Sequence, residues 1–402
     1  MLLEFTFENV FSYKNETYFS MEAAKGTKFM NEFAKVNGHR ILKTAIVFGS
    51  NASGKSNLIG SLNLMRNVIC NPWMLPSSLL FPSFAGTKDE PIILSITILK
   101  EKLIYRYTFS YHPQEIVSEK LEIESEGKFE TYFKREGDEY SIIPEGLKIL
   151  IDKTRRDTLF LTVAKTFNDT YSSNVFQWFH QDLTYLNTNI DHSGQNINFE
   201  PLKNEMYKNA VLKFMRAADV SIEDMQVINE TMGTRLLLKH RHYSAKGERL
   251  PDFTLDFSQE SEGTRKLLYL AHTILLTENR TILIDEFDRS LHFELSQALL
   301  GLLNSSENNN QFILTTHQIN LMDFDFKKEQ IYFVERKDDG VSDLYSAYDF
   351  TMETNRKDYS YLKRYMNGQF GAIPIILLDT LIETIKEVRE ISWEEKIVKN
   401  VD

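Results

Sequence analysis

Hydrophobic and polar residues alternate at the start of the chain, and the pattern then changes to a helical spacing. The opening MLLEFTFENVFSY predicts a strand, followed by a turn over 12–16 and a second short strand. A mostly apolar run over 44–48 predicts a buried strand that leads into a glycine-bearing loop, and residues 57–69 have the spacing of a helix. Pro72 and Pro76 end that helix.

The next segment alternates as an antiparallel sheet does. Residues 92–109, with the runs ILSITIL and LIYRYTF, predict two strands joined at 100–102, and the runs 117–123 and 129–133 continue that sheet. From about 145 to 218 the spacing becomes helical. Five aromatic residues there are expected to pack a core rather than bind a cofactor: Phe160, Phe167, Phe176, Trp178 and Phe179.

Strand and helix patterns alternate after this stretch. A hairpin comes first, from 235–242 and 253–257 across the turn-rich segment 244–251. A helix, a strand, a helix and two strands then follow, over 264–276, 281–284, 293–304, 311–315 and 330–334. Such alternation is typical of a mainly parallel sheet covered by helices. The sequence therefore predicts an α/β fold with an added antiparallel lobe.

Composition and charge narrow the class of protein. With 402 residues, 42% of them apolar, the chain can bury a large core in two or three connected lobes. The net charge of −11 argues against a protein that coats nucleic acid, and the single Cys70 excludes an internal disulfide or a thiolate zinc cluster. The N-terminus does not have the pattern of a signal peptide, and the apolar runs are shorter than the ~20 residues of a membrane span. A cytoplasmic protein without membrane association is expected.

The strongest chemical signal is a G-x-x-x-x-G-K-S motif between the predicted strand at 44–48 and the predicted helix. In such a loop the backbone N–H groups and the helix N-terminus bind phosphate oxygens. Lys55 is expected to neutralise the outer phosphates, and Ser56 to hold Mg²⁺. With glycine at 17 of 402 positions, a chance match is at or below roughly one per cent. The residues expected to contact ATP are Gly49, Ser50, Asn51, Ala52, Ser53, Gly54, Lys55, Ser56 and Asn57.

A second signal is a pair of carboxylates at the end of the apolar run TILI. Asp285 and Glu286 follow it directly, where open parallel sheets place their ligand sites. Asp285 is expected to hold Mg²⁺, and Glu286 to act as general base on the attacking water. The alternative is an ordinary strand that ends in a solvated acidic turn. The phosphate-binding motif in the same chain weighs against that alternative.

A serine and a glycine stand at the start of the predicted helix 264–276. Ser261, Gly263 and Thr264 offer a hydroxyl and free N–H groups at a helix N-terminus, which makes a second anion site. Read alone, Ser261 could simply cap the helix. Its position before the acidic strand favours the anion site. Two phosphate sites in one chain predict a homodimer in which each ATP lies between the loop of one copy and the serine–glycine element of the other.

A histidine follows the next predicted strand, in the run Thr315-Thr316-His317. It is expected to sense the γ-phosphate through a hydrogen bond. A lone histidine is usually structural, but the order of loop, serine–glycine element, acidic strand and histidine favours a functional role. Residues 288–292, between the acidic strand and His317, resemble a loop that touches the facing subunit.

Together these segments resemble the ABC-ATPase superfamily, and within it the SMC, RecF and OLD-like branch. The N-terminal strand, Walker A loop, signature motif, Walker B with D-loop and switch histidine of that branch resemble FTFENVFSY, NASGKSNL, QESEGTRKLL, ILIDEFDRSLH and TTH. The resemblance implies a P-loop ATPase head that hydrolyses ATP to ADP and phosphate with Mg²⁺. It also implies that Lys55, Glu286 and His317 are catalytic.

The signature form E-S-x-G-T and the C-terminal YLKRYMNGQFGAIP resemble more closely the compact AAA-family ATPases of prokaryotic defence operons, the RloA, AbiLi and PARIS AriA class. This likeness implies an antiphage, abortive-infection sensor that controls a separately encoded nuclease or TOPRIM-type effector. The same likeness is compatible with a phage-encoded trigger and with an assembly larger than the dimer. The alternative is a RecF-like repair ATPase that binds DNA. The basic clusters 239–242, 356–357 and 363–364 favour this alternative. A scaffold that does not hydrolyse ATP is disfavoured because Lys55 and Glu286 are both present.

The chain departs from the pattern of that superfamily in two respects. Phe81-Pro82-Ser83-Phe84 stands where a Q-loop glutamine is expected, and no heptad run is long enough for an extended coiled coil. The expected division is 1–135 for the N-terminal part of the ATPase head with its β-lobe, 136–230 for a compact, mainly helical insertion, 231–350 for the C-terminal part of the head and 351–402 for a helical segment.

Overall fold

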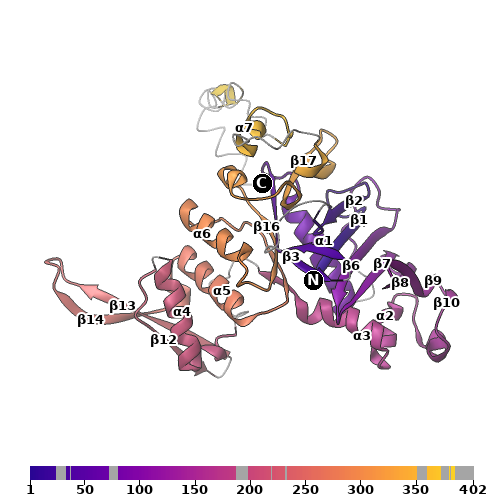
Figure 1. Ribbon diagram of the computed structural model, residues 1–402, viewed down its shortest axis with the longest axis horizontal. Helices are drawn as coiled ribbons and strands as arrows, with labels where there is room; N and C mark the ends of the chain where they lie inside the picture. Colours follow the sequence, from indigo (N-terminus) through magenta and orange to yellow (C-terminus); the bar gives the residue numbers. More distant parts are fainter. Residues whose placement is uncertain are drawn as a thin grey trace, which may run out of the picture.

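The computed structural model describes residues 1–23, 33–36, 38–71, 80–186, 198–218, 220–230, 233–350, 360–372, 380 and 382–384. Two large sheets and the helices around them form the body, and a β-ribbon projects from one end (Figure 1). Every helix within these residues is too short or too polar to cross a lipid bilayer.

A six-stranded sheet with the order β11-β15-β16-β5-β17-β18 forms the centre of the fold. All its neighbours pair in parallel except β17 and β18, which pair antiparallel. The inner strands consist almost entirely of buried residues, as expected where both faces of a sheet are covered. The strands are β5 (Thr44–Gly49), β11 (Leu183–Leu186), β15 (Thr281–Ile284), β16 (Gln311–Thr315), β17 (Ile331–Arg336) and β18 (Ser342–Ser346).

The two faces of this sheet belong to two separate hydrophobic cores. Ala45 and Val47 of β5 pack with α1, whereas Ile46 and Phe48 of the same strand pack with α4, α5 and α6. Alternate residues of a strand point to opposite faces, so one strand contributes to both cores. The helices are α1 (Lys55–Cys70), α4 (Glu205–Ala217), α5 (Glu262–Leu276) and α6 (Phe293–Asn304).

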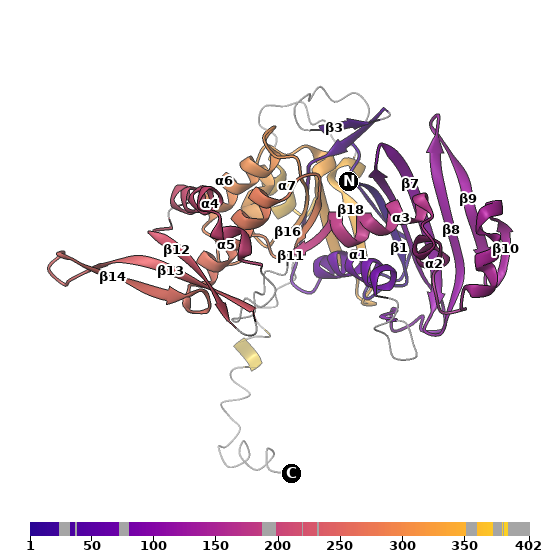
Figure 2. The same ribbon diagram turned by 90° about the horizontal axis from the view of Figure 1, so that it is seen from below.

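A seven-stranded antiparallel sheet, β10-β9-β8-β7-β6-β1-β2, packs on the α1 side and confirms the predicted lobe. Helices α2 (Phe160–Thr166) and α3 (Thr170–Gln177) lie beside it (Figure 2). Its strands are β1 (Leu2–Glu8), β2 (Thr17–Ser20), β6 (Ile92–Lys100), β7 (Leu103–His112), β8 (Glu115–Ser125), β9 (Lys128–Glu136) and β10 (Glu139–Ile142). Nearby are β3 (Phe33–Val36), β4 (His39–Leu42), the 3₁₀ helix η1 (Glu145–Lys153) and the π-helix η2 (Trp178–Asp182).

A three-stranded ribbon projects from the other end of the molecule, beside α4 and α5 (Figure 2). It consists of β12 (Asp224–Glu230), β13 (Gly233–Tyr243) and β14 (Arg249–Asp256), and its last two strands are the predicted hairpin. The remaining elements are the 3₁₀ helices η3 (Glu200–Lys203), η4 (Phe257–Gln259), η5 (Ile319–Asp323), η6 (Lys328–Gln330) and η7 (Ala347–Asp349), and the short helix α7 (Tyr361–Met366).

Three details differ from the sequence-based expectation. β11, inside the predicted helical stretch, is a strand that pairs in parallel with β15, because four residues are too few to show a period. β12 was not predicted and adds a strand to the hairpin. Phe160, Trp178 and Phe179 are buried as predicted, but Phe167 is 52% exposed.

The side chain of Gln311 joins the two large sheets. It is fully buried at the start of β16. Its Nε2 donates to the carbonyl oxygens of Leu2 and Leu42, at 2.9 and 3.1 Å, and its Oε1 accepts from the Leu2 N–H at 2.8 Å and the Thr281 hydroxyl at 2.9 Å. One amide therefore satisfies four polar groups from three other strands in a place that water does not reach.

Replacing Gln311 with leucine is expected to lower the free energy of unfolding by about 2–4 kcal/mol, because several buried polar groups lose their partner. Urea denaturation measures this loss. The matched control is Gln177→Leu on the exposed surface of α3, which is expected to change stability by less than about 0.5 kcal/mol. Equal unfolding midpoints for the two variants would contradict the role given to Gln311.

Candidate functional site

The phosphate-binding motif forms the loop between β5 and α1. Gly54 directly precedes α1 with a φ of 119°, a left-handed conformation that favours glycine. A Cβ on Gly54 would lie 2.4 Å from Ser342 Oγ, and one on Gly49 would lie 2.4 Å from the carbonyl oxygen of Val334. The strands β17 and β18 therefore press against the loop closely enough to require glycine at both positions.

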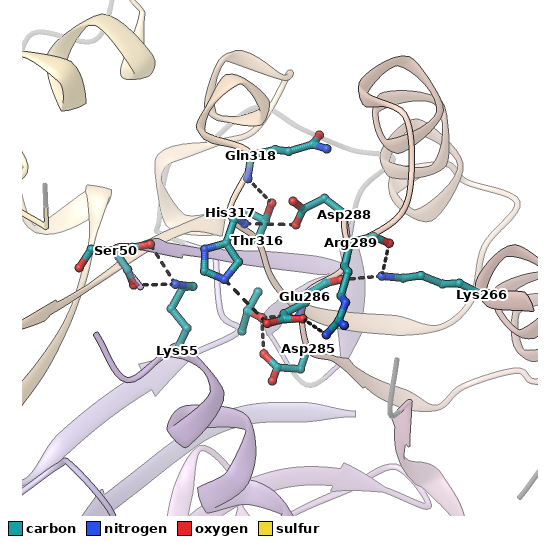
Figure 3. Close-up of polar contacts among 12 residues, drawn as sticks. Ser50, Lys55, Lys266, Asp285, Glu286, Asp288, Arg289, Thr316, His317 and Gln318 are labelled. Carbon is teal, nitrogen blue, oxygen red and sulfur yellow. Dashed lines mark hydrogen bonds and ion pairs between the residues drawn. The ribbon is translucent and has the colours of Figure 1, made fainter. Parts of the chain in front are cut away.

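Lys55 is the first residue of α1 and lies buried inside this loop. Its Nζ donates to the carbonyl oxygens of Gly49 and Ser50, at 2.9 Å each (Figure 3). Burial lowers the pKa of Lys55 to about 8, although the carboxylates that follow β15 act in the opposite direction. A partly desolvated cation is thus held within the electrostatic reach of the acidic residues.

The other loop residues divide into exposed and buried ones. Those exposed are Asn51, Ala52 and Ser56. Ser53 is buried, and within the described residues its Oγ has no hydrogen-bond partner. Asn57 Nδ2 donates to Ser12 Oγ at 2.7 Å. Ser56 is therefore accessible from solvent, and the side chain of Asn57 links the start of α1 to the N-terminal turn.

Asp285 and Glu286 follow β15, and the last residue of β16 holds both. The hydroxyl of Thr315 donates to Asp285 Oδ1 at 2.5 Å and accepts from the backbone N–H of Glu286 at 2.8 Å. Glu286 has a φ of 50°, so the chain turns sharply at this residue. One threonine therefore sets the position of both carboxylates relative to the neighbouring strand.

His317 lies beside Glu286, as Figure 3 shows. Its Nε2 is 4.0 Å from Glu286 Oε1, and its backbone N–H donates to Asp288 Oδ1 at 3.2 Å. The structure thus brings together residues from three separate parts of the sequence, namely Lys55, the pair Asp285 and Glu286, and His317. They lie where the parallel strands β5, β15 and β16 end.

The serine–glycine element begins α5. Ser261 is the N-cap of that helix, because its Oγ accepts from the Thr264 N–H at 3.1 Å. Gly263 packs against the loop after Glu286, where a Cβ would lie only 2.6 Å from the carbonyl oxygen of Ser290. The interpretation of Ser261 as a cap is therefore correct, and the serine also remains exposed at the helix N-terminus.

Sequence reasoning missed Lys266, which ties α5 to the acidic turn. Only 2% of its surface is exposed, and its Nζ donates to the carbonyl oxygens of Glu286 at 2.6 Å and of Arg289 at 3.0 Å (Figure 3). Burial lowers the pKa of Lys266 to about 8. In the sequence Lys266 is one lysine of an amphipathic helix. Only its burial and its hydrogen bonds show that it fixes the acidic turn to α5.

Arg289 is a second cation at this turn, and it belongs to the loop 288–292 that the sequence pattern singled out. Its Nη1 lies 3.0 Å from Glu286 Oε2, and its Nε lies 3.1 Å from Glu262 Oε1. Glu262 belongs to the first turn of α5, next to Ser261. The arginine is about half exposed, so it links the acidic turn to the serine–glycine element at the molecular surface.

The basic cluster 239–242 lies in β13 and is matched by carboxylates. Lys239 pairs with Asp252 at 3.3 Å, His240 with Glu260 at 2.6 Å and Arg241 with Glu223 at 2.6 Å. These partners come from β14 and from segments that flank the ribbon. Part of the positive charge that the sequence shows is therefore neutralised within the ribbon. The cluster 356–357 lies outside the described residues.

The residues around Lys55 fit a nucleoside triphosphate with a divalent cation. The loop is closed so tightly by β17 and β18 that only glycine fits at its two ends. Loops of this kind bind phosphate through their backbone N–H groups. A buried ammonium and an exposed hydroxyl stand at the start of α1. Asp285 adds a carboxylate, and oxygen atoms are the ligands that Mg²⁺ prefers.

Replacing Lys266 with methionine is expected to loosen the turn that holds Glu286, because two carbonyl oxygens lose a buried donor. Hydrogen–deuterium exchange measures this as faster exchange over 286–291, by about tenfold for each 1.4 kcal/mol of local stability lost. Lys213→Met, an exposed position on α4, is the control and is expected to leave that segment unchanged. Unaltered exchange in the Lys266 variant would contradict the proposed tie.

Three solved structures of SMC head domains are similar to the chain. The first is an SMC head bound to the C-winged helix domain of ScpA, with 15% sequence identity, coverage of 86% of this chain and 97% of that chain, and a TM-score of 0.45. The second is the SMC head domain from Thermotoga maritima, with 15% identity, coverage of 86% of this chain and 98% of that chain, and a TM-score of 0.39. The third is an Smc head domain with an extended coiled coil bound to the C-terminal domain of ScpA, from Pyrococcus furiosus, with 14% identity, coverage of 97% of this chain and 99% of that chain, and a TM-score of 0.45. No curated protein sequence matches the chain.

One protein-family model matches residues 45–323 and is described as "AAA domain, putative AbiEii toxin, Type IV TA system". The matched span covers more than half of the chain. It includes the glycine loop, the serine–glycine element, the acidic turn and His317. The chain therefore belongs to this family of AAA-domain proteins.

Proposed function

We propose that the chain binds and hydrolyses ATP. The observation that carries this proposal is the meeting of the glycine loop, the carboxylates of Asp285 and Glu286, and His317 at one edge of the central sheet. A phosphate cradle, a magnesium ligand, a general base and a hydrogen-bonding histidine are the parts that phosphoryl transfer to water requires. Membership of an AAA-domain family supports the same conclusion.

Each residue has a defined task in this proposal. The backbone N–H groups of the loop from Gly49 to Asn57 hold the phosphates, and Lys55 neutralises the outer ones. Mg²⁺, held by Ser56 and Asp285, supplies Lewis acidity and charge neutralisation when bound. Glu286 takes a proton from the attacking water, and His317 donates a hydrogen bond to the γ-phosphate.

We further propose that the site is completed by a second copy of the chain. Ser261, Gly263 and Thr264 are accessible at the start of α5, where a helix N-terminus attracts anions. Lys266 and Arg289 connect this same helix to the Glu286 turn. A phosphate bound by the serine–glycine element of one copy would therefore also influence the position of Glu286 in that same copy.

The biological role that we propose is that of a cytoplasmic sensor in antiphage defence. The family description, with its toxin and TA system, supports this role, as does the resemblance to the RloA, AbiLi and PARIS AriA class. In this role the dimerised heads, or a larger assembly of them, control a separate nuclease or TOPRIM-type effector in response to a phage-encoded trigger. Residues 1–135 and 231–350 are proposed to form the head together with β11, which the segment 136–230 contributes to the central sheet. The rest of the insertion over 136–230 is proposed to contact partners.

The alternative of a DNA-gripping repair ATPase has less support. One of the basic clusters that favour it is 239–242, of which Lys239, His240 and Arg241 pair with carboxylates. DNA binding that weakens steeply as salt is added would favour this alternative. Purified protein that does not bind DNA would favour the sensor.

Glu286→Gln is expected to slow phosphate release by about two orders of magnitude or more, because the general base is lost while the binding residues remain. With ATP, this variant is expected to sediment as a dimer. Glu294→Gln on the exposed start of α6 is the control and should hydrolyse ATP at the wild-type rate. Equal rates for wild type and Glu286→Gln would remove the catalytic assignment.

A mixing experiment tests whether the site is shared. Lys55→Ala and Ser261→Arg are each expected to be inactive, but their mixed dimer contains one intact site. An equimolar mixture should therefore recover about a quarter of the wild-type rate if subunits exchange freely in a two-fold symmetric dimer. Mixing Lys55→Ala with Glu286→Gln is the control, since both changes affect the same side of the site and no intact site forms. Equal recovery in both mixtures, or in neither, contradicts a shared site.

A further inference from the structure

A pocket of about 430 Å³ opens where α1, η1, α2 and α3 meet. Cys70 at the end of α1 lines one side, and Lys153 at the end of η1 lines another. Lys165 of α2 and Phe176 of α3 complete the wall. The volume lies within the range of about 300–1,000 Å³ that small-molecule sites occupy. None of these residues belongs to the ATP site described above.

The described charged side chains that line this pocket are all positive. Its described lining has three cations and no carboxylate, the cations being Lys153, Arg155 and Lys165. Arg155 pairs with Asp157 at 2.6 Å, whereas Lys153 Nζ lies 5.0 Å from the ring centroid of Phe167 and Lys165 Nζ lies 4.2 Å from that of Phe176. The chain as a whole has a net charge of −11, so a concentration of positive charge here favours an anion.

The walls between the cations are apolar and aromatic. Phe167 is 52% exposed, so its ring offers surface to a bound molecule, whereas the half-buried Phe176 ring already contacts Lys165 and stacks with His180. A planar group that stacks on such rings removes apolar area from water. Thr162 and Thr166 donate their hydroxyl hydrogens to backbone carbonyls, at 2.7 and 2.8 Å, so their oxygens act toward a ligand as acceptors.

Cys70 adds no negative charge to this pocket. Burial raises the pKa of its thiol to about 11, although the nearby cations act in the opposite direction. The thiol is therefore neutral at physiological pH, and it does not compete with a bound anion for the cations. The lining thus combines cationic donors, aromatic surface and hydroxyl acceptors.

We propose that this pocket binds a small planar anion with the size and chemistry of a nucleoside monophosphate. The ring system lies against Phe167, and the phosphate lies among Lys153, Arg155 and Lys165. The oxygens of the threonines accept hydrogen bonds from the amino groups of the ring. This placement follows from the lining, in which each of the two aromatic rings has a lysine beside it.

This pocket is distinct from the glycine loop, although α1 joins them. The loop precedes the first residue of α1, and Cys70 is the last residue of that helix. A helix of 16 residues spans about 24 Å, so one nucleotide cannot occupy both places. Binding at the two places can therefore be separated by substitutions at either end of the helix.

Equilibrium dialysis of the full chain with radiolabelled AMP tests the proposal. Lys55→Ala, which removes the loop cation, should leave AMP binding unchanged, whereas Lys165→Glu and Lys153→Glu should each weaken it by about tenfold or more. Lys148→Glu is the matched control, because Lys148 lies in the same η1 segment, is 53% exposed and is not part of the lining. Thermal unfolding of each variant verifies that it folds. The exposed Lys153 supplies the test if the variant of the half-buried Lys165 does not fold.

Competition separates the two parts of the ligand. Adenosine without phosphate and inorganic phosphate without a ring should each displace AMP at least about tenfold more weakly than unlabelled AMP, because each makes only half of the contacts. Three results would overturn the proposal: no AMP binding, loss of AMP binding in Lys55→Ala alone, or competition by inorganic phosphate as strong as by AMP.

Discussion

The parallel pairing of β5, β16 and β15 is the constraint on which the candidate site depends. In this register Val47 lies opposite Thr315, and Ile284 lies opposite Leu314, so the three strands end at one edge. Each part of the candidate site directly follows the end of one strand: the glycine loop follows β5, the acidic turn follows β15, and His317 follows β16. Thr315 adds the cross-link, because its hydroxyl bonds to Asp285 and to the backbone of Glu286. A shift of one residue in this pairing would send alternate side chains to the other face and separate these groups.

Two buried lysines give this edge its electrostatic character. Burial lowers the pKa of both Lys55 and Lys266 to about 8, and both ammonium groups are directed at backbone carbonyls. A desolvated cation gains more from an anionic partner than a hydrated one does, because water screens it less. Lys55 Nζ lies inside the glycine loop. Lys266 instead fixes the turn of Glu286 to α5, so the helix that carries Ser261 also sets the position of Glu286.

The α1 helix connects this edge to the opposite side of the molecule. It packs against β5 and the seven-stranded sheet, and its last residue lines the cationic pocket. The two hydrophobic cores meet at the central sheet, whose strands contribute alternate residues to each. Close packing of this kind means that a displacement of α1 is transmitted to the strands it touches rather than absorbed. The arrangement places one helix between the glycine loop and the cationic pocket.

The sequence alone determined the parts of this protein that depend on local pattern. The glycine loop, the acidic turn, the order of strands and helices from 264 onward and the antiparallel lobe follow from spacing, and the structure shows them in those places. The tertiary structure alone decided what depends on long-range packing. β11 became a strand because β15 offers it an edge, and Lys266 became a tie because α5 lies on the acidic turn. The cations near Cys70 became one pocket because α1, η1, α2 and α3 meet there. The local sequence contains the periodicity and the turn residues, but the burial of a side chain and its contacts are decided only when distant segments pack together.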